Sequence, residues 1–279
     1  MDYAAAISVD PDSIFERGSR TYYNASRFFP KALRARVTTL YAFVRTADDY
    51  VDATPQDAAG FAAFRARWKA AAGGSPTGDT IVDTFAALAA DAGFERPWEE
   101  AFLDAMEADL TVREYDSLEA TLGYVYGSAE VIGLFMARLM ELPPESYPAA
   151  RSLGRAMQYV NFVRDFAEDR ALGRRYLPLE GADPAVADEA GARAAPEAFA
   201  GFLRRHVERY SAWADEGREG FHYIPRRYRI AIATAMDMYD WTASKVHDQP
   251  LLVWERKVRP PKAIIIADAF RNVFSRGLG

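Results

Sequence analysis

The 279-residue sequence contains no cysteine and only three histidines. The absence of cysteine excludes a disulfide framework, a thiolate nucleophile and any metal site built on thiolates. Three histidines are too few to suggest a multi-histidine metal centre. Acidic residues outnumber basic ones, and the resulting net charge of −6 argues against a nucleic-acid-binding function.

Signals for export and membrane insertion are also missing from the sequence. The N-terminal residues do not show a basic region followed by an apolar core, as a signal peptide would. No stretch approaches the ~20 apolar residues that are needed to span a bilayer. We therefore expect a cytoplasmic protein that binds no nucleic acid and that associates with membranes at most peripherally.

The sequence also lacks the alternating apolar pattern of β-strands. Apolar residues instead recur at spacings of three and four through most of the chain, which is typical of amphipathic helices. The segment 181–195 is rich in alanine and glycine, and we expect it to be a surface loop. No break resembles a domain linker and no repeat is visible, so the pattern predicts one all-α domain over residues 1–279, a bundle of about eight to ten helices. The clearest late helices are predicted over Leu118–Leu142, Tyr147–Leu172, Pro196–Arg218, Pro225–His247 and Pro261–Phe274.

Two acidic motifs stand out, and the first lies in a predicted helix near residue 48. Asp48 and Asp52 are four residues apart, so their carboxylates share one face of the helix, and Tyr41 and Arg45 follow the same stripe. Like charges at this spacing destabilise a helix by a few tenths of a kcal/mol, which a bridging cation would reverse. Taken alone, the motif is equally compatible with a solvated acidic face.

The second acidic motif lies in a more apolar predicted helix. Its polar residues form one stripe, whereas the positions on both sides of the stripe are apolar. Such a helix should be buried, and buried carboxylates must be paired or bound to a metal. Two such stripes on separate helices can face each other across a bundle core. The polar residues of this second stripe are Gln158, Asn161, Asp165, Glu168 and Asp169.

The donor atoms in both motifs are oxygens, which indicates a hard cation. Carboxylates and an asparagine carbonyl favour Mg²⁺ first and Mn²⁺ second over zinc or copper. Mg²⁺ commonly uses one or two protein carboxylates together with substrate phosphates. A di-iron bundle site would require Glu-x-x-His, which is absent from these helices. The sequence therefore points to a magnesium–phosphate site in a helical bundle.

Both motifs and their surroundings resemble the squalene/phytoene synthase family of head-to-head prenyl transferases. The resemblance extends from about Ser19 to Lys262, and it departs from the family at Ser128-Ala129-Glu130, where Val-Ala-Gly is frequent. The position of Glu130 relative to the cavity is left open by this departure. The segments that carry the resemblance are Ser19–Pro30, Tyr41–Asp52, Tyr124–Gly133, Gln158–Asp169 and Gly173–Pro178.

The resemblance implies an isoprenoid-synthase bundle with a central cavity, in which two prenyl diphosphates condense through a cyclopropylcarbinyl diphosphate. It implies catalytic roles for Tyr41, Arg45, Asp48, Asp52, Tyr126, Asp165 and Asp169. It implies a metal site made by Asp48, Asp49, Asp52, Asn161, Asp165 and Asp169. It implies substrate contacts from Ser19, Tyr22, Ser26, Thr38, Arg45, Gln158, Asn161, Arg164, Tyr239, Arg256 and Arg259. Candidate aromatic residues for the cavity wall are Tyr22, Tyr41, Phe43, Tyr126 and Phe162.

The length of the substrate is suggested by two small residues. Thr38 lies ten residues before Asp48, which places it ~15 Å along the helix from the phosphate end. Thr38 and Ser26 are small, which favours C20 geranylgeranyl diphosphate and hence phytoene over C15 farnesyl diphosphate. Squalene or dehydrosqualene synthesis from the C15 substrate, the former using NADPH, stays an alternative, as do a class I terpene cyclase and an inactive assembly subunit. The oligomeric state is left open.

Overall fold

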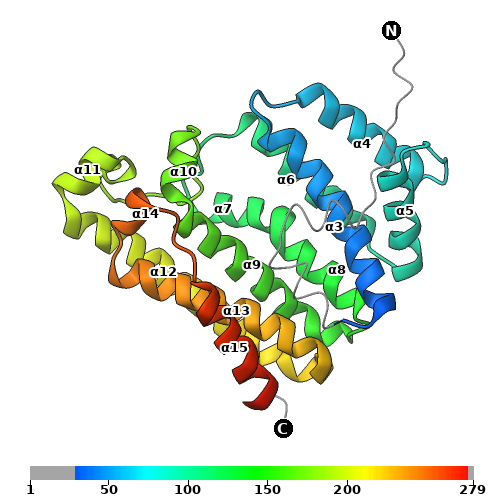
Figure 1. Cartoon of the computed structure of the whole chain (residues 1–279). Coiled ribbons are helices and arrows are strands. Elements are labelled where there is room, and N and C mark those ends of the chain that lie inside the picture. The colour runs from blue at the N-terminus through cyan, green and yellow to red at the C-terminus, as the bar shows by residue number, and fades with distance from the viewer. Residues whose placement is uncertain (1–28, 276–279) are drawn as a thin grey trace.

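The computed structural model describes residues 29–275, and these residues form helices without any β-strand (Figure 1). The expected all-α fold is confirmed for this part of the chain. Helices are more numerous there than the sequence pattern suggests, because several have only one or two turns. The α-helices are α3 (Lys31–Asp52), α4 (Ala58–Ala72), α5 (Thr80–Ala92), α6 (Arg96–Thr111), α7 (Leu118–Val125), α8 (Val131–Leu139), α9 (Tyr147–Arg164), α10 (Phe166–Ala171), α11 (Glu189–Ala194), α12 (Pro196–Glu219), α13 (Arg226–Asp248), α14 (Leu252–Glu255) and α15 (Lys262–Ser275).

The segment that we expected to be a surface loop is partly helical and partly buried. It contains the 3₁₀ helix η3 (Pro184–Ala187) as well as α11. Asp188 caps α11 by accepting a hydrogen bond from the backbone N–H of Gly191, 2.8 Å away. Val186 and Ala192 are buried. The loop prediction is therefore wrong here, because a side-chain cap and a few well-placed apolar residues are enough to order a short helix.

A continuous helical run crosses the middle of the molecule. It joins α7, the π-helical turn η1 (Tyr126–Glu130) and α8. Contrary to the expectation from the sequence, the run Leu118–Leu139 is long and apolar enough to cross a membrane. However, 56% of its most apolar window is buried inside the protein, which is the behaviour of a core helix.

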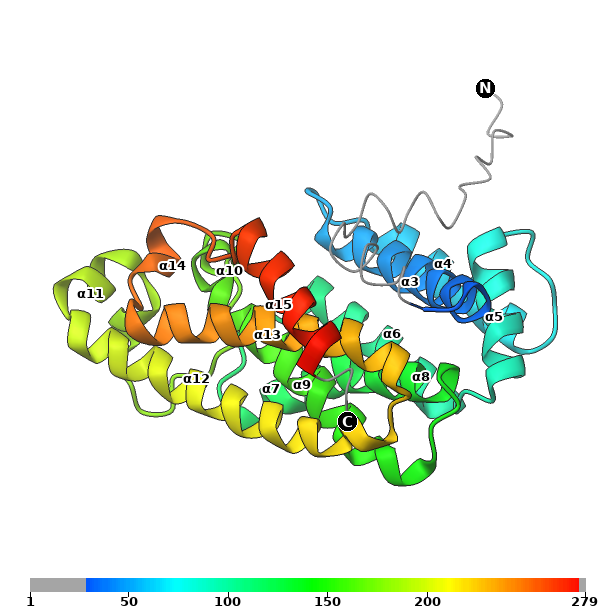
Figure 2. The ribbon, with the colours of Figure 1, turned by 60° about the horizontal axis from the view of Figure 1, so that its bottom comes forward.

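The helices are arranged in three groups. Figure 1 shows α7–α9 in the middle of the molecule, with α3–α6 on one side and α12–α15 on the other. In Figure 2, α15 crosses α13, where the Asn272 side-chain N–H donates to Asp237 over 2.6 Å. At the junction of α12 with α9, a Cβ on Gly217 would lie 2.6 Å from Cγ of Leu153, so only glycine permits this close approach.

Helix α3 carries the first acidic motif and has one face in the apolar core and another on a cavity. Phe43, Ala47 and Val51 of α3 are completely buried in the apolar core. On the other face, Tyr41 and Asp48 line a large cavity. Because the core side is packed along the length of the helix, the cavity side is held in a fixed orientation.

Candidate active site

A cavity of about 870 Å³ lies between α3, α6, α7–α8, α9 and α13. Its polar end is lined by both acidic motifs, so the structure brings together the two stripes that the sequence predicted to face each other. The rest of its wall is mainly apolar, which suits a ligand with a charged head and a long hydrocarbon tail. The charged and amide residues that line the cavity are Arg45, Asp48, Asp52, Asp109, Gln158, Asn161, Arg164, Asp165, Asp169, Arg174, Lys257 and Arg259.

The carboxylates on the cavity wall formed by α3 are partly neutralised by nearby arginines. Arg45 forms ion pairs with Asp48 at 2.7 Å and with Asp49 at 2.6 Å. Burial, and next the charge of Asp52, raise the pKa of Asp48 to about 7. Asp52 accepts a hydrogen bond from Arg174 at 3.2 Å. This wall therefore carries negative charge that a bound cation would stabilise.

The opposite wall is built where α9 ends. The sequence predicted one helix through this motif, but α9 stops at Arg164 and α10 begins at Phe166, so Asp165 lies at a turn between them. Arg164 donates to Asp165 at 2.8 Å, and Nζ of Lys257 lies 3.0 Å from it. Burial opposes ionisation of Asp165, but Arg164 and then Lys257 outweigh this effect and lower its pKa.

Two further polar side chains on this wall, Asp169 and Asn161, are not fully neutralised or hydrogen-bonded. Burial, and next the charge of Asp165, raise the pKa of Asp169 to about 8. The side-chain oxygen of Asn161 is buried and has no hydrogen-bond partner among the described residues. A buried acceptor without a donor is costly, so both groups mark a place where a ligand would improve the local electrostatics.

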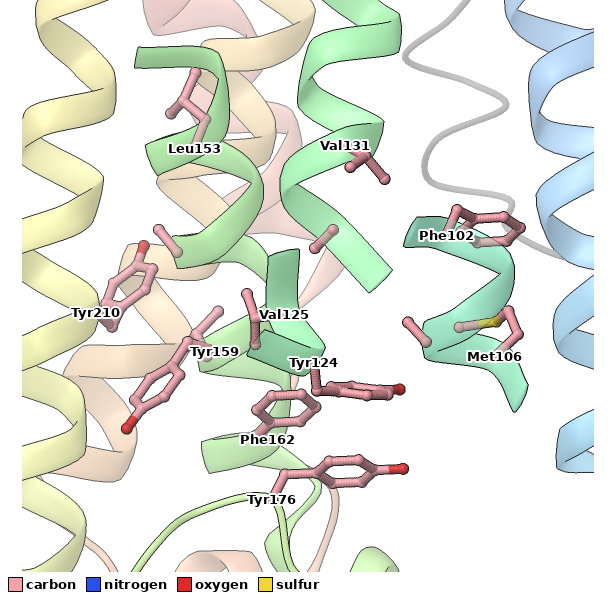
Figure 3. Packing of buried hydrophobic residues seen from close by; sticks show 14 of the residues in the cluster. Phe102, Met106, Tyr124, Val125, Val131, Leu153, Tyr159, Phe162, Tyr176 and Tyr210 are labelled. Atoms are coloured by element: carbon pink, nitrogen blue, oxygen red, sulfur yellow. The ribbon is translucent and has the colours of Figure 1, made fainter. Parts of the chain in front are cut away.

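Aromatic residues close the cavity beside these carboxylates. The rings of Phe162 and Tyr176 stack with their centroids 4.5 Å apart and nearly parallel, and Tyr124 lies 5.2 Å from Tyr176. Figure 3 shows the rings of Tyr124 and Phe162 beside each other, above that of Tyr176. The π electrons of Tyr124 and Phe162, which line the cavity, can stabilise a positive charge there.

Four of the lining residues were missed by the sequence analysis. Asp109, Tyr124, Arg174 and Tyr176 all line the polar end of the cavity. Asp109 follows Phe102 and Met106 at spacings of seven and three on α6, so it lies on that helix's buried face. A lone acid on an apolar stripe is the signal that could have identified it.

Two predicted aromatic wall residues lie elsewhere, so these predictions are wrong. Tyr126 is not among the residues that line the large cavity; the guanidinium of Arg151 lies 5.2 Å from its ring. Two residues along a helix correspond to a rotation of roughly 200°, so the side chains of Tyr124 and Tyr126 leave the helix in different directions. Phe43 stacks on Phe85 in the core, with ring centroids 3.7 Å apart.

Three further predicted positions also lie outside the cavity lining. Asp49 is exposed and is not among the lining residues, although it pairs with Arg45, which is. Thr38 is buried, whereas its neighbour Val37 lines the wall. Arg256 sits in extended backbone after α14, and the alternation of that segment turns Lys257 and Arg259 inward instead. The predicted substrate contacts Ser19, Tyr22 and Ser26 lie outside the described residues, as does the predicted wall residue Tyr22.

Glu130, whose position relative to the cavity the sequence left open, lies outside the cavity wall. It is buried at the end of the π-helical turn and forms ion pairs with Arg151 at 2.7 Å and Arg155 at 2.6 Å. Glu130 is not part of the cavity lining, so it adds no carboxylate to the wall. None of the three histidines lines the large cavity either. The predicted positions that do line it are Tyr41, Arg45, Asp48, Asp52, Gln158, Asn161, Phe162, Arg164, Asp165, Asp169, Tyr239 and Arg259.

Comparisons with known proteins agree with this geometry. The squalene/phytoene synthase family model matches residues 15–263. The chain is 30% identical over 264 residues to a phytoene synthase of Pseudescherichia vulneris, which covers 90% of this chain and 85% of the relative. It is 30% identical over 236 residues to a 15-cis-phytoene synthase of a Paracoccus species, covering 80% and 76%.

Solved structures show the same fold. The squalene synthase HpnC from Alicyclobacillus acidocaldarius superposes with a TM-score of 0.76 at 22% identity, covering 86% of this chain and 92% of that one. A dehydrosqualene synthase in complex with a ligand also gives a TM-score of 0.76 at 22% identity, covering 94% and 93%.

Proposed function

The chain belongs to the squalene/phytoene synthase family and is a prenyltransferase, and we propose that it joins two molecules of geranylgeranyl diphosphate head to head into phytoene. The observation that carries this proposal is the single cavity that connects two acidic walls to a long apolar space. The acidic end suits diphosphate bound with a cation, and the apolar end suits prenyl chains. The names of the two phytoene synthase relatives support the same reaction.

The length of the cavity supports a C20 substrate. Ala149 and Asp165 both line it, and Ala149 lies sixteen residues before Asp165 along α9. At 1.5 Å per residue the two are about 24 Å apart. A fully extended backbone advances about 1.2 Å per bond, so a C20 prenyl chain reaches roughly 18 Å and a C15 chain roughly 13 Å. The apolar wall therefore accommodates the longer chain with its diphosphate.

The residues at the polar end fit a divalent cation such as Mg²⁺ or Mn²⁺. All the donors are oxygens, and the unpartnered Asn161 oxygen and the raised pKa values of Asp48 and Asp169 support a positive charge at this end of the cavity. Among the described residues, no cluster of three or more carboxylate or histidine side chains is placed to hold a metal ion without further ligands. Diphosphate oxygens would complete the coordination, as is usual for Mg²⁺. We propose the ligands Asp48, Asp52, Asn161, Asp165 and Asp169.

A bound metal would supply charge neutralisation of the leaving diphosphate. The residues of the chain do the remaining work. Arg45, Arg164 and Lys257 lie beside the carboxylates and can bind phosphate oxygens. The apolar wall excludes water from the allylic cation, and the aromatic rings of Tyr124 and Phe162, which line the cavity, stabilise its charge.

The main alternative is condensation of C15 farnesyl diphosphate to squalene or dehydrosqualene. The two solved neighbours carry these names, but their 22% identity supports the fold alone. Squalene formation would need NADPH, whereas phytoene formation needs no reductant. An inactive assembly subunit would be expected to lose motif carboxylates, and all of them are present in this chain.

Mass spectrometry of the product tests the proposal. The enzyme is incubated with Mg²⁺ and either the C15 or the C20 diphosphate, each with and without NADPH. We expect a C40 hydrocarbon from the C20 substrate without NADPH. Turnover of the C15 substrate alone would contradict the choice of geranylgeranyl diphosphate. Flotation with liposomes tests a further proposal, that such apolar substrates are collected by peripheral docking on a membrane.

A further inference from the structure

The polar end of the cavity contains one carboxylate that belongs to neither acidic motif. Asp109 on α6 is only 4% exposed. Its Oδ2 accepts a hydrogen bond from the hydroxyl of Tyr124 at 2.6 Å, and its Oδ1 accepts one from Tyr176 at 2.7 Å. No ion pair neutralises Asp109 among the described residues, and Arg174 turns its guanidinium to Asp52 and to the Val51 carbonyl instead.

The arrangement fixes the tyrosine hydroxyls rather than leaving them free to rotate. The ring of Tyr124 contacts two other tyrosine rings, Tyr176 with centroids 5.2 Å away and Tyr115 with centroids 5.3 Å away. In Figure 3 the hydroxyls of Tyr124 and Tyr176 point to the same side, where Met106 of α6 lies. Asp109 follows Met106 by one helical turn, so α6 carries the acceptor that both hydroxyls share.

The proposed condensation requires a proton acceptor at this end of the cavity. The ionised C1 of one prenyl group adds to the C2=C3 double bond of the other, which leaves a cation at C3. Closure of the cyclopropane between C1 and C3 then requires loss of a proton from C1. Histidine, the commonest general base, is absent from the cavity wall, and Asp165 is paired with Arg164 and Lys257.

We propose that Asp109 is the terminal acceptor of this proton and that the hydroxyl of Tyr124 relays it. The C1–H bond breaks, and its electron pair forms the C1–C3 ring bond. The proton moves to the Tyr124 oxygen while the proton of that hydroxyl moves to Oδ2 of Asp109. Tyr124 stays neutral, Asp109 becomes a carboxylic acid, and the released diphosphate removes the proton before the next turnover. This inference rests on the proposed head-to-head reaction.

The protonation behaviour of both groups agrees with such a relay. Burial raises the pKa of Asp109, and the hydroxyls and Arg174 offset this only in part, so the carboxyl gains affinity for a proton. Burial and the charge of Asp109 raise the pKa of Tyr124 well above its usual value. A free tyrosinate is therefore disfavoured, and a concerted transfer through the neutral hydroxyl is the accessible route.

The test uses Asp109→Asn and Tyr124→Phe in the full-length enzyme, with substrate carrying deuterium in place of both C1 hydrogens. We expect each variant to lose about 10²–10⁴-fold in turnover, the usual contribution of general acid–base catalysis. Each should also show a larger primary isotope effect than the wild type, since proton removal becomes the slow step. Tyr176→Phe is the matched control, because it removes the other hydroxyl from Asp109. It should leave the isotope effect unchanged, because Tyr124 still donates to Asp109.

The outcomes separate a relay from a structural role. A loss of turnover in Asp109→Asn and Tyr124→Phe without a rise in the isotope effect would overturn the relay. Equal losses of turnover and equal isotope effects in all three variants would also overturn the relay. Should Asp109→Asn fail to fold, Tyr124→Phe alone decides. The comparison uses whichever of the C15 and C20 diphosphates the wild type condenses, so an error in chain length leaves it valid. No condensed product from either substrate would overturn the proposed function and this inference together.

Discussion

The side chain of Asp52 accepts a hydrogen bond from Nη1 of Arg174 at 3.2 Å, across 122 residues of sequence. Arg174 also donates to the backbone oxygen of Val51 at 3.0 Å. The segment that follows the second acidic motif is thereby tied to the end of the helix that carries the first. This contact fixes the distance between the two acidic walls, which is the dimension that a cation and a diphosphate must match.

Loss of this tie should lower both stability and activity. Arg174→Met removes two hydrogen bonds made by a buried guanidinium, and at about 1 kcal/mol for each bond the free energy of unfolding should fall by about 2 kcal/mol. Urea denaturation measures the change. Arg193→Met is the control, because Arg193 pairs with Glu189 on the surface of α11 at a helical spacing worth only about 0.2–0.5 kcal/mol. Equal effects of the two substitutions would contradict a special role for Arg174.

Removal of divalent metal should abolish turnover, and Mg²⁺ should restore it. Because the protein donors are incomplete without phosphate oxygens, Mg²⁺ and diphosphate together should raise the melting temperature more than either alone. Asp48→Asn and Asp169→Asn should remove most of this shift. Asp49→Asn should retain more of it, since Asp49 does not line the cavity. Full activity in the presence of a chelator would rule out the metal-dependent mechanism.

The sequence predicted the acidic walls well because helical spacing decides them. Residues 48 and 52, like 161 and 165, lie one turn apart, so any helix places each pair on one face. The apolar residues around the second stripe also indicated correctly that its helix packs in the core, although the stripe itself is only half-buried and Glu168 is exposed. All-α architecture followed from the same periodicity, which extends over most of the chain.

The remaining parts of the site depend on contacts between segments that periodicity does not encode. Tyr124 and Tyr126 are indistinguishable in the sequence, and only the packing of α7 against α6 and α9 decides which one faces the cavity. The inward turn of Arg174 follows Gly173, whose φ of 71° lies in the left-handed region. Asp109 belongs to no motif, and its role emerges only once two distant tyrosines reach it.

Acid should destabilise the protein through His206. Burial, and next the charge of Arg209, lower the pKa of His206 to about 3, and the Tyr159 hydroxyl lies 2.7 Å from its Nδ1. The unfolded chain, with a histidine pKa near 6.5, therefore binds more protons than the folded chain below that pH. Stability is complete above pH ~6.5 and falls toward pH ~3 by about 1.4 kcal/mol per pH unit.

The histidine contribution is measurable by urea denaturation between pH 7 and pH 5. The substitution His206→Gln should lower stability at pH 7, because it disturbs a fully buried site. It should also reduce the slope of the unfolding free energy against pH by the contribution of one titrating proton. His222→Gln is the control. The His222 imidazole is exposed, so this substitution should leave the slope unchanged. An unaltered slope in His206→Gln would show that His206 does not cause the acid sensitivity.

The apolar end of the cavity should set the length of the prenyl chain. Ala150 lines the cavity fifteen residues before Asp165, about 22 Å along α9, and a phenylalanine there would fill space that the last isoprene unit of a C20 chain needs. Ala150→Phe should therefore lower kcat/KM for the C20 diphosphate at least tenfold, since even one methylene in a hydrophobic pocket is worth about 1–3 kcal/mol, or roughly 10–200-fold. Turnover of the C15 diphosphate, which ends roughly 13 Å from the head, should change far less. Ala150→Ser keeps the size of the side chain and serves as the control. Equal losses for both substrates in Ala150→Phe would mean that the substitution distorts the bundle, and an unchanged preference for C20 would place the end of the chain elsewhere.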